Sequence, residues 1–175
     1  MRPAIAPASL PRAAGFRFAI VVSRFNERIT GSLLEAARAA LREAGVADAD
    51  VEELSVPGAF ELPQAARCAA ETAMFDAVIC LGCVIRGATP HFEYISAATA
   101  QGVMSAAGDT GVPMAFGVLT TDTEAQADER AGAGPGNKGR EAAAIEMAVL
   151  FRRMGRPPAR TGNGPFGVVD PGHSQ

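Results

Sequence analysis

The sequence has no tryptophan and one tyrosine, and aromatic residues make up only 6% of its 175 residues. Cysteine and histidine are also scarce, with three and two copies. Three cysteines are few and cannot all pair, which argues against the disulfide framework typical of small secreted domains. A chain of this length can bury roughly 70% of its unfolded surface and needs no such crosslinks. We therefore expect a single folded domain held together by packing.

An excess of charge and long apolar runs are also missing. The formal net charge is −3; because nucleic-acid-binding surfaces are basic, we expect no nucleic-acid partner. The longest apolar run, residues 77–85, is far shorter than the roughly 20 residues that cross a bilayer, so we expect no membrane association. The N-terminal stretch "MRPAIAPASLPRAAG" has repeated prolines and lacks the apolar core of a signal peptide. We therefore expect a cytoplasmic protein.

The two ends differ in composition from the middle of the chain. Residues 1–15 carry repeated prolines, and residues 155–175 are rich in glycine and proline. Such composition at a terminus is typical of flexible segments. We expect a flexible N-terminal extension over 1–15, a folded domain over 16–154 and a flexible C-terminal tail over 155–175.

Cys80 and Cys83 form a C-x-x-C pair, which suggests redox or zinc chemistry. Both lie in "AVICLGCVI", a run typical of a buried strand. Side chains three positions apart point to opposite faces of a strand, and no second pair completes a zinc site. We therefore expect two buried thiols, with no metal and no redox role.

Apolar segments alternate with amphipathic ones along the folded region. Strands are predicted over 15–23, 51–56, 76–85 and 113–121. Helices are predicted over 29–45, 60–73, 90–107, 122–131 and 137–154. Thr30 or Ser32 can cap the first helix. Apolar strands separated by helices indicate an α/β fold with a parallel sheet covered on both faces. We expect a flavodoxin-like three-layer sandwich whose four-stranded parallel sheet has the order 2-1-3-4.

Ligands of such folds bind outside the carboxyl ends of the strands. Distinctive residues follow each predicted strand: "SRFNE" after the first, "PGAFE" after the second, "RGATPH" after the third and "TTDT" after the fourth. Phe25, Phe60 and Glu61 lie close to the first two strand ends. We therefore expect the functional site at this edge of the sheet.

The turn "GATPHF" has the residues of an anion site at a helix start. Gly87 permits a tight backbone path, Thr89 is a good N-cap, and Pro90 suits the first helical position. The backbone N–H groups and dipole of that helix favour an anion, and Arg86 and the Thr89 hydroxyl add charge and a donor. A phosphate is the natural ligand; the alternative is a well-capped helix that binds nothing.

His91 falls in the first turn of the same predicted helix. Near neutral pH an imidazole can act as general acid or general base. By position alone, a surface histidine without a role is an equal alternative.

The loop "GPGNKG" (134–139) matches G-x-G-x-x-G by letter only. It lies between two helical segments instead of following a strand, so it is not a dinucleotide fingerprint, and Asn137 stands where a P-loop requires glycine. Lys138 and the upstream Arg130 are two cations that could meet a phosphate. Taken alone, two such cations are more often solvated surface charges.

Five segments together resemble 6,7-dimethyl-8-ribityllumazine synthases: "RFN", "VPGAFELP", "LGCVIRGATPHFEYI", "FGVLTTDTEAQADERAG" and "GNKGREAA". The resemblance runs from about Phe16 to Met154. It implies the flavodoxin-like fold and the condensation of 5-amino-6-(D-ribitylamino)uracil with 3,4-dihydroxy-2-butanone 4-phosphate, without metal or organic cofactor. It also implies a homopentamer, in many relatives assembled into a 60-mer of twelve pentamers, with each active site between neighbouring subunits. Association with riboflavin synthase is a further partnership that it suggests.

The resemblance also implies roles for single residues in binding the ribitylaminouracil. Phe25 would stack on the pyrimidine ring, and the Glu61 carboxylate would accept hydrogen bonds from ribityl hydroxyls. The pocket would further be lined by Ala59 and Phe60 and by the backbone of Cys83, Val84 and Ile85.

The remaining implied roles concern phosphate, proton transfer and the neighbouring subunit. Ala88, Thr89 and Arg130 match the phosphate-binding positions, and His91 matches the proton-transfer residue. The adjacent subunit would supply its Phe116, Arg130 and Lys138. Arg86 and Glu141 are supporting candidates, the latter as a partner of Lys138 or His91.

One departure from the family pattern lies in the loop "AGAGPG", where Gly134 stands near a lysine of many relatives. It removes one cation and leaves Arg130 and Lys138. Two alternatives to the enzyme remain at this point. One is a non-catalytic flavin-binding or shell protein on the same scaffold. The other is a flavodoxin-like FMN carrier, although "SRFNERITG" is not the phosphate loop expected after its first strand.

Overall fold

The computed structural model describes residues 9–140 and 143–160. Within these ranges, the strands form a four-stranded parallel sheet in the order β2-β1-β3-β4, which confirms the predicted order. The strands are β1 (Phe18–Ser23), β2 (Val51–Val56), β3 (Ala77–Ile85) and β4 (Met114–Thr121). The α-helices are α1 (Glu27–Glu43), α2 (Leu62–Glu71), α3 (His91–Thr110), α4 (Glu124–Ala131) and α5 (Ala143–Arg153). Short 3₁₀ turns are η1 (Asp48–Asp50), η2 (Ala59–Glu61) and η3 (Lys138–Arg140).

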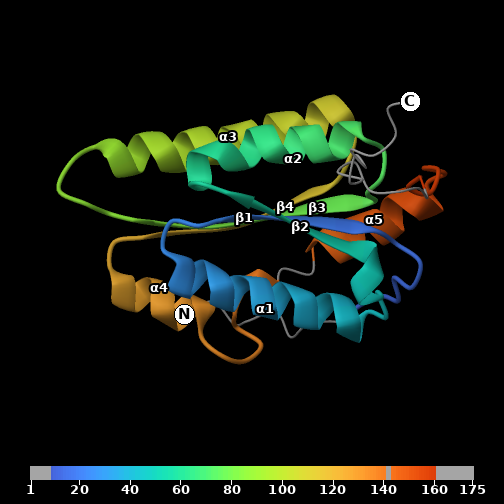
Figure 1. Ribbon diagram of the computed structural model, residues 1–175, viewed down its shortest axis with the longest axis horizontal. Helices are drawn as coiled ribbons and strands as arrows, with labels where there is room; N and C mark the ends of the chain where they lie inside the picture. Colours follow the sequence, from blue (N-terminus) through green and yellow to red (C-terminus); the bar gives the residue numbers. More distant parts are fainter. Residues whose placement is uncertain (1–8, 141–142, 161–175) are drawn as a thin grey trace, which may run out of the picture.

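The helices cover the sheet on both faces, as the apolar character of the strands predicted. In Figure 1, α2 and α3 lie on one face and α1, α4 and α5 on the other. The first seven of the nine residues of β3 are buried, and β1 is buried almost throughout. Burial on both faces is what a central parallel strand requires. Within the described residues no helix has both the length and the apolar character to span a membrane.

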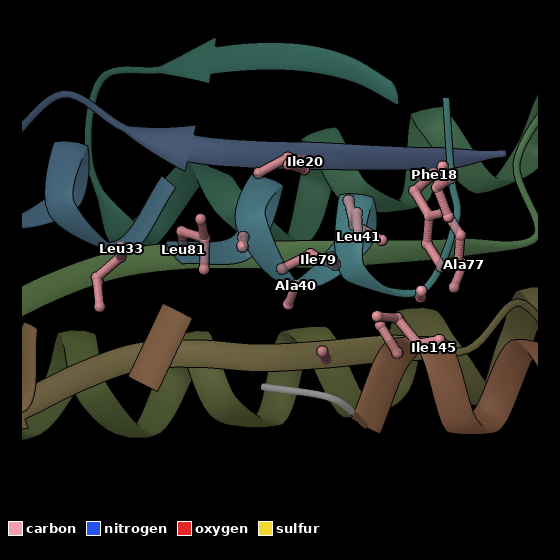
Figure 2. Close-up of a cluster of buried hydrophobic side chains, with 14 of the residues drawn as sticks. Phe18, Ile20, Leu33, Ala40, Leu41, Ala77, Ile79, Leu81 and Ile145 are labelled. Atoms are coloured by element: carbon pink, nitrogen blue, oxygen red, sulfur yellow. The ribbon is translucent and has the colours of Figure 1, made fainter. Parts of the chain in front are cut away.

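Alternate side chains of the central strands divide the core into two layers. Phe18 and Ile79 point to the side of α1 and α5, where they pack with Leu41 and Ile145 (Figure 2). Cys80 belongs to the opposite layer, beneath α2 and α3, whereas Cys83 belongs to the layer with α1. The expected opposite placement of the two buried thiols is therefore confirmed.

The start of α1 differs from the prediction. The helix begins at Glu27, and its N-cap is Asn26 rather than Thr30 or Ser32. Both hydroxyls instead lie inside the helix and bond back to carbonyls, Thr30 to that of Glu27 and Ser32 to that of Arg28. Such back-bonding satisfies a hydroxyl within a helix, so a hydroxyl residue near a predicted start need not be its cap.

The predicted helix over 137–154 is also different. Its beginning is the 3₁₀ turn η3, and α5 covers Ala143–Arg153. Gly139 in η3 lies directly against α1, where an added Cβ would come within 2.0 Å of the Leu33 carbonyl oxygen. The missing side chain lets the two backbones touch, which an apolar periodicity alone does not reveal.

The segments that flank the domain are partly described. Ala13 is buried, and its N–H donates to the Ala44 carbonyl. At the other end, the buried carboxylate of Asp76 accepts hydrogen bonds from Arg152 and from the N–H of Ala159. Residues 1–8 and 161–175 lie outside the described residues, so the flexible termini stay predictions.

Candidate active site at the carboxyl edge of the sheet

A cavity of about 600 Å³ opens at the carboxyl ends of β1, β2 and β3. This volume is in the range of small-molecule sites. Its walls come from the segments that follow these strands, and they are Phe25, Pro57, Gly58, Ala59, Phe60, Glu61, Cys83, Val84, Ile85, Gly87, Thr89, His91, Phe92 and Ile95. The structure therefore brings together nine of the residues predicted for the site, from motifs far apart in the sequence.

Two aromatic rings are exposed at this cavity. Phe25 is 70% exposed and Phe60 is 61% exposed. The backbone around Phe25 is fixed to the neighbouring connection, because Arg24 N–H donates to the Val56 carbonyl and Phe25 N–H to the Pro57 carbonyl. Large apolar rings left in solvent on a fixed backbone typically mark a binding surface. These rings can stack on a planar ligand.

The turn η2 holds the carboxylate of the site. One oxygen of Glu61, Oε2, accepts a hydrogen bond of 2.9 Å from the Gly58 N–H. A carboxylate has several acceptor positions, so this bond orients Glu61 and leaves it capacity for ligand hydroxyls. The turn lies against α3, where the Thr99 hydroxyl is 2.7 Å from the Ile95 carbonyl oxygen and 3.2 Å from that of Ala59, so its one proton is shared between them.

The end of β3 presents backbone to the cavity. In the pairing of β1 with β3 the last partners are Val22 and Leu81, whereas β3 and β4 stay paired as far as Ile85 and Thr121. Cys83, Val84 and Ile85 therefore extend beyond the paired part of β1, on the side where the cavity lies. Extended backbone in this position can bind the polar edge of a ring.

The thiols are not suited to nucleophilic chemistry. Burial raises the pKa of Cys83 to about 11 and that of Cys80 to about 12. Near neutral pH both are protonated, and the thiolate is the reactive form. Cys83 contributes a wall of the cavity, as predicted, and in the described part of the chain no group of histidine, cysteine and carboxylate side chains could hold a metal ion.

At the start of α3, the predicted capping residue is wrong, whereas an anion site in front of the helix stays a prediction. The N-cap is Pro90, not Thr89, and no side chain caps the helix. The first N–H groups of a helix have no partner inside it, so the absence of a capping side chain suits an anion in front of α3. Thr89 and Gly87 line the cavity, and Ala88 belongs to the same exposed turn without lining it. His91, the first residue of α3, also lines the cavity.

Arg86 is bound to carboxylates rather than directed to the cavity. Its guanidinium bridges Asp122, at 2.7 Å, and Glu93, and it lies 4.3 Å from the centre of the Phe92 ring. The same interaction holds the pKa of Glu93 below its ordinary value. These contacts connect the β3–α3 turn to α3 and to the end of β4. An anion would have to compete with both carboxylates, so direct support from Arg86 stays a prediction.

The predicted cations lie elsewhere on the chain. Phe116, Arg130 and Lys138 line a separate cavity of about 230 Å³ on β4, which is an edge strand. It shares no lining residue with the cavity at β1–β3. Phe116 is 39% exposed there. Glu141, the proposed partner of Lys138 or His91, lies outside the described residues.

The residues that position α4, the helix of Arg130, were not identified from the sequence. The Thr123 side chain accepts from the Gln126 N–H and caps α4, the helix of Arg130. Arg28 joins α1 to α4 through Asp128, at 2.5 Å, and Glu124, at 2.8 Å. Arg28 lies two positions after the "RFN" motif and could have been noticed, but its partners are about one hundred positions away. Only the fold shows that they meet.

A larger depression of about 900 Å³ lies between α1 and the loop after α4. Its lining is mostly alanine, glycine and proline, and none of the residues predicted for the site belongs to it. Gly134, the position of the departure from the family pattern, lies here with φ 112°. A lysine in that conformation would be strained. The backbone conformation of this loop therefore favours glycine over lysine at position 134.

The fold and the cavity define a class: α/β sandwich proteins that bind a small ring-containing ligand at the carboxyl edge of a parallel sheet. Residues 15–152 match the family model for 6,7-dimethyl-8-ribityllumazine synthase. A protein named 6,7-dimethyl-8-ribityllumazine synthase from Syntrophus aciditrophicus (strain SB) is 56% identical over 144 residues, which cover 81% of this chain and 94% of that protein. The chain belongs to the 6,7-dimethyl-8-ribityllumazine synthase family.

Proposed function

We propose that this protein condenses 5-amino-6-(D-ribitylamino)uracil with 3,4-dihydroxy-2-butanone 4-phosphate to 6,7-dimethyl-8-ribityllumazine, a reaction of riboflavin biosynthesis. Family membership and the close relative of that name carry the reaction. The structural observation that best supports this reaction is that nine of the residues predicted for the site line one cavity. Membership of the family does not favour the non-catalytic alternative.

The aminouracil fits the aromatic part of the cavity. Its ring stacks on Phe25, and its polar edge meets the backbone of Cys83, Val84 and Ile85. The ribityl chain extends along Ala59 and Phe60, with hydroxyls donating to Glu61. The apolar walls and the single carboxylate support this orientation, because apolar surface takes the ring and a few placed polar groups fix its direction.

The phosphate of the second substrate lies at the turn of Ala88 and Thr89, in front of α3. An amine of the uracil attacks the ketone, and loss of water gives a Schiff base. Phosphate is then eliminated, and the second amine closes the ring with loss of another water. Each step moves a proton, and His91 at the wall of the cavity is placed to move it.

The site is completed by a second copy of the chain. The described lining of the main cavity contains no lysine or arginine, although a phosphate is normally bound with cations. Arg130 on α4 and Lys138 in η3 line a different cavity of the same chain, together with Phe116 of the edge strand β4. A neighbouring copy that presents its β4 edge to the cavity would supply them.

This arrangement is head-to-tail, and such contacts form a closed ring when the rotation between copies is a whole fraction of a turn. We therefore extend the proposal to a homopentamer, with the 60-mer of twelve pentamers as the larger assembly. A cytoplasmic location and an association with riboflavin synthase belong to the same proposal. Small molecules remain the substrates, with no metal or organic cofactor required.

The reaction is tested by mixing the purified protein with both substrates. The absorbance and fluorescence of the lumazine report product directly. The proposal predicts formation well above the uncatalysed background measured without protein. Formation at the background rate by folded protein would contradict it.

A further inference from the structure

Asn26 has an unusual backbone conformation directly beside the cavity. Its φ is 60° and its ψ is 48°, and among the described residues only Ala73 is another non-glycine residue with positive φ. Asparagine tolerates this left-handed region better than most residues. The conformation turns the chain from the end of β1 into α1 within three residues, immediately after Phe25.

The Asn26 side chain is not used for the role that its position predicts. Asparagine is a preferred N-cap because its side chain can accept a helix N–H. Here the side chain makes no capping bond, and the N–H groups of Ile29 and Thr30 turn to the Asn26 backbone carbonyl instead. The amide Nδ2 donates to the Cys83 carbonyl at 3.0 Å, across 57 positions of sequence.

This hydrogen bond continues the sheet where its backbone pairing has ended. The last paired residues of β1 and β3 are Val22 and Leu81, and the Asn26 amide bridges the same two strands further along. On its other side, the turn is bound to the β2 connection through Phe25 N–H and the Pro57 carbonyl. The turn that contains Phe25 and Asn26 is therefore bound on one side to β3 and on the other to the connection after β2, and both of these line the cavity.

We propose that Asn26 is a positioning residue that sets the slot between the Phe25 ring and the Cys83–Ile85 backbone, and so the affinity for the aminouracil. This inference rests on the proposed function. It requires no contact between Asn26 and the substrate, because the residue acts through Phe25 and Cys83. The turn of Ala88 and Thr89, which receives the other substrate, is not bound by Asn26.

Three variants distinguish the effect of the left-handed backbone from that of the Asn26 side-chain hydrogen bond. Asn26→Gly keeps the left-handed conformation, which glycine adopts freely, and removes only the amide. Asn26→Asp keeps size and shape but places an acceptor against the Cys83 carbonyl. Ala73→Gly is the matched control, because it changes the other positive-φ residue, at the far end of α2.

The main measurement is calorimetric binding of 5-amino-6-(D-ribitylamino)uracil, with melting temperature and the KM of each substrate alongside. For Asn26→Gly we expect binding weakened about five- to tenfold, the usual effect of one hydrogen bond. Asn26→Asp should bind more weakly still. In both variants the KM for the butanone phosphate should stay within about twofold, since its site is not held by this bond. Ala73→Gly should match the unmodified protein.

Two results would overturn the inference. One is unchanged uracil affinity in Asn26→Gly. The other is an equal loss for both substrates that accompanies a lower melting temperature, because this is the effect of general loosening. Failure of the proposed function is a separate result, seen as the absence of turnover in the unmodified protein. The binding comparison among the variants decides the role of Asn26 in either case.

Discussion

His91 shows how much the surroundings of a residue decide its role. By sequence it is one of two histidines and lies near the start of a predicted helix. In the structure it begins α3 and lines the cavity together with Phe25, Glu61 and Cys83, each of which follows or ends a different strand. The proton-transfer role comes from the family resemblance, and its place at the cavity makes that role physically reasonable.

Replacing His91 by alanine should weaken turnover without abolishing it. General acid–base catalysis typically contributes roughly 10²–10⁴-fold, and much of the remaining acceleration comes from holding the two reactants together. We expect lower kcat with little change in aminouracil binding. Single-turnover kinetics and calorimetry on the folded variant measure the two effects. Complete loss of turnover with intact binding would contradict this division.

The three cysteines should differ in reactivity. Cys68 is exposed, whereas Cys80 and Cys83 are buried and their pKa values are raised to about 12 and 11 by burial. At about pH 8, iodoacetamide should modify Cys68 alone in the folded protein and all three thiols after denaturation, because only thiolates react. Mass spectrometry of the alkylated peptides gives the result. Modification of Cys83 as rapid as that of Cys68 would show a reactive thiol and contradict the account.

The same pKa values predict the effect of alkali on stability. The two buried thiols have folded pKa values above the ordinary 9.0, so the unfolded state loses protons first as the pH rises. Their contribution is complete below about pH 9 and is lost as the pH rises through the folded values. Urea unfolding at increasing pH should show this decrease. In a Cys80→Ala variant the decrease should be smaller.

At the scale of elements, the sequence predicted the strands well, but it placed the caps of α1 and α3 and the start of α5 incorrectly. The strands of β1 and β3 are apolar throughout because both faces are covered, and this signal is local. The cap of α1 is a left-handed Asn26 whose side chain donates to the Cys83 carbonyl of β3. This contact spans 57 positions, so no local pattern could predict it. In α3, Pro90 takes the N-cap position one residue later than predicted, and no side chain caps the helix.

The close packing of the 3₁₀ turn η3 against α1 can be tested by substitution of Gly139. An added Cβ on Gly139 would come within 2.0 Å of the Leu33 carbonyl oxygen of α1. Because the blocking atoms all belong to the Leu33 backbone, which cannot turn away as a side chain can, Gly139→Ala should cost roughly 3 kcal/mol or more, by analogy with severe overpacking. The shift would also move Lys138 and impair turnover. Thermal unfolding and the lumazine assay measure both effects.

Gly136→Ala is the matched control for this substitution. It lies in the same loop, and an added Cβ there has no heavy atom within 4 Å. Its stability and turnover should equal those of the unmodified protein. If both alanine variants behaved alike, the close packing of η3 on α1 would not be the reason for the glycine.

For the whole molecule, the described residues form one α/β domain, and the residues predicted for the site lie in two separate cavities of it. The main cavity has a carboxylate and a histidine, whereas Arg130 on α4 and Lys138 in η3 line a separate cavity beside β4. The motifs in the sequence identified all of these residues. Their spacing along the sequence could not show which of them meet within one chain, because this depends on how the helices and turns pack on the sheet.

Assembly should be visible in solution. Tyr94 and Met104 on α3, and Leu150 and Met154 on or near α5, are exposed large apolar side chains. Covering such surfaces favours association. Light scattering should therefore give the mass of a pentamer of the 18.0 kDa chain, or of a 60-mer, rather than that of one chain. A monomer that turns over both substrates would contradict the shared site.

The claim that one site is built from two copies has a direct test by complementation. One variant carries Phe25→Ala and His91→Ala, and the other carries Arg130→Ala and Lys138→Ala. Each alone should form lumazine slowly. After equal amounts are unfolded and refolded together, a head-to-tail ring restores about one quarter of the sites, because each site takes one half from each neighbour. The account predicts this recovery of lumazine formation; activity equal to the mean of the two separate variants would contradict it.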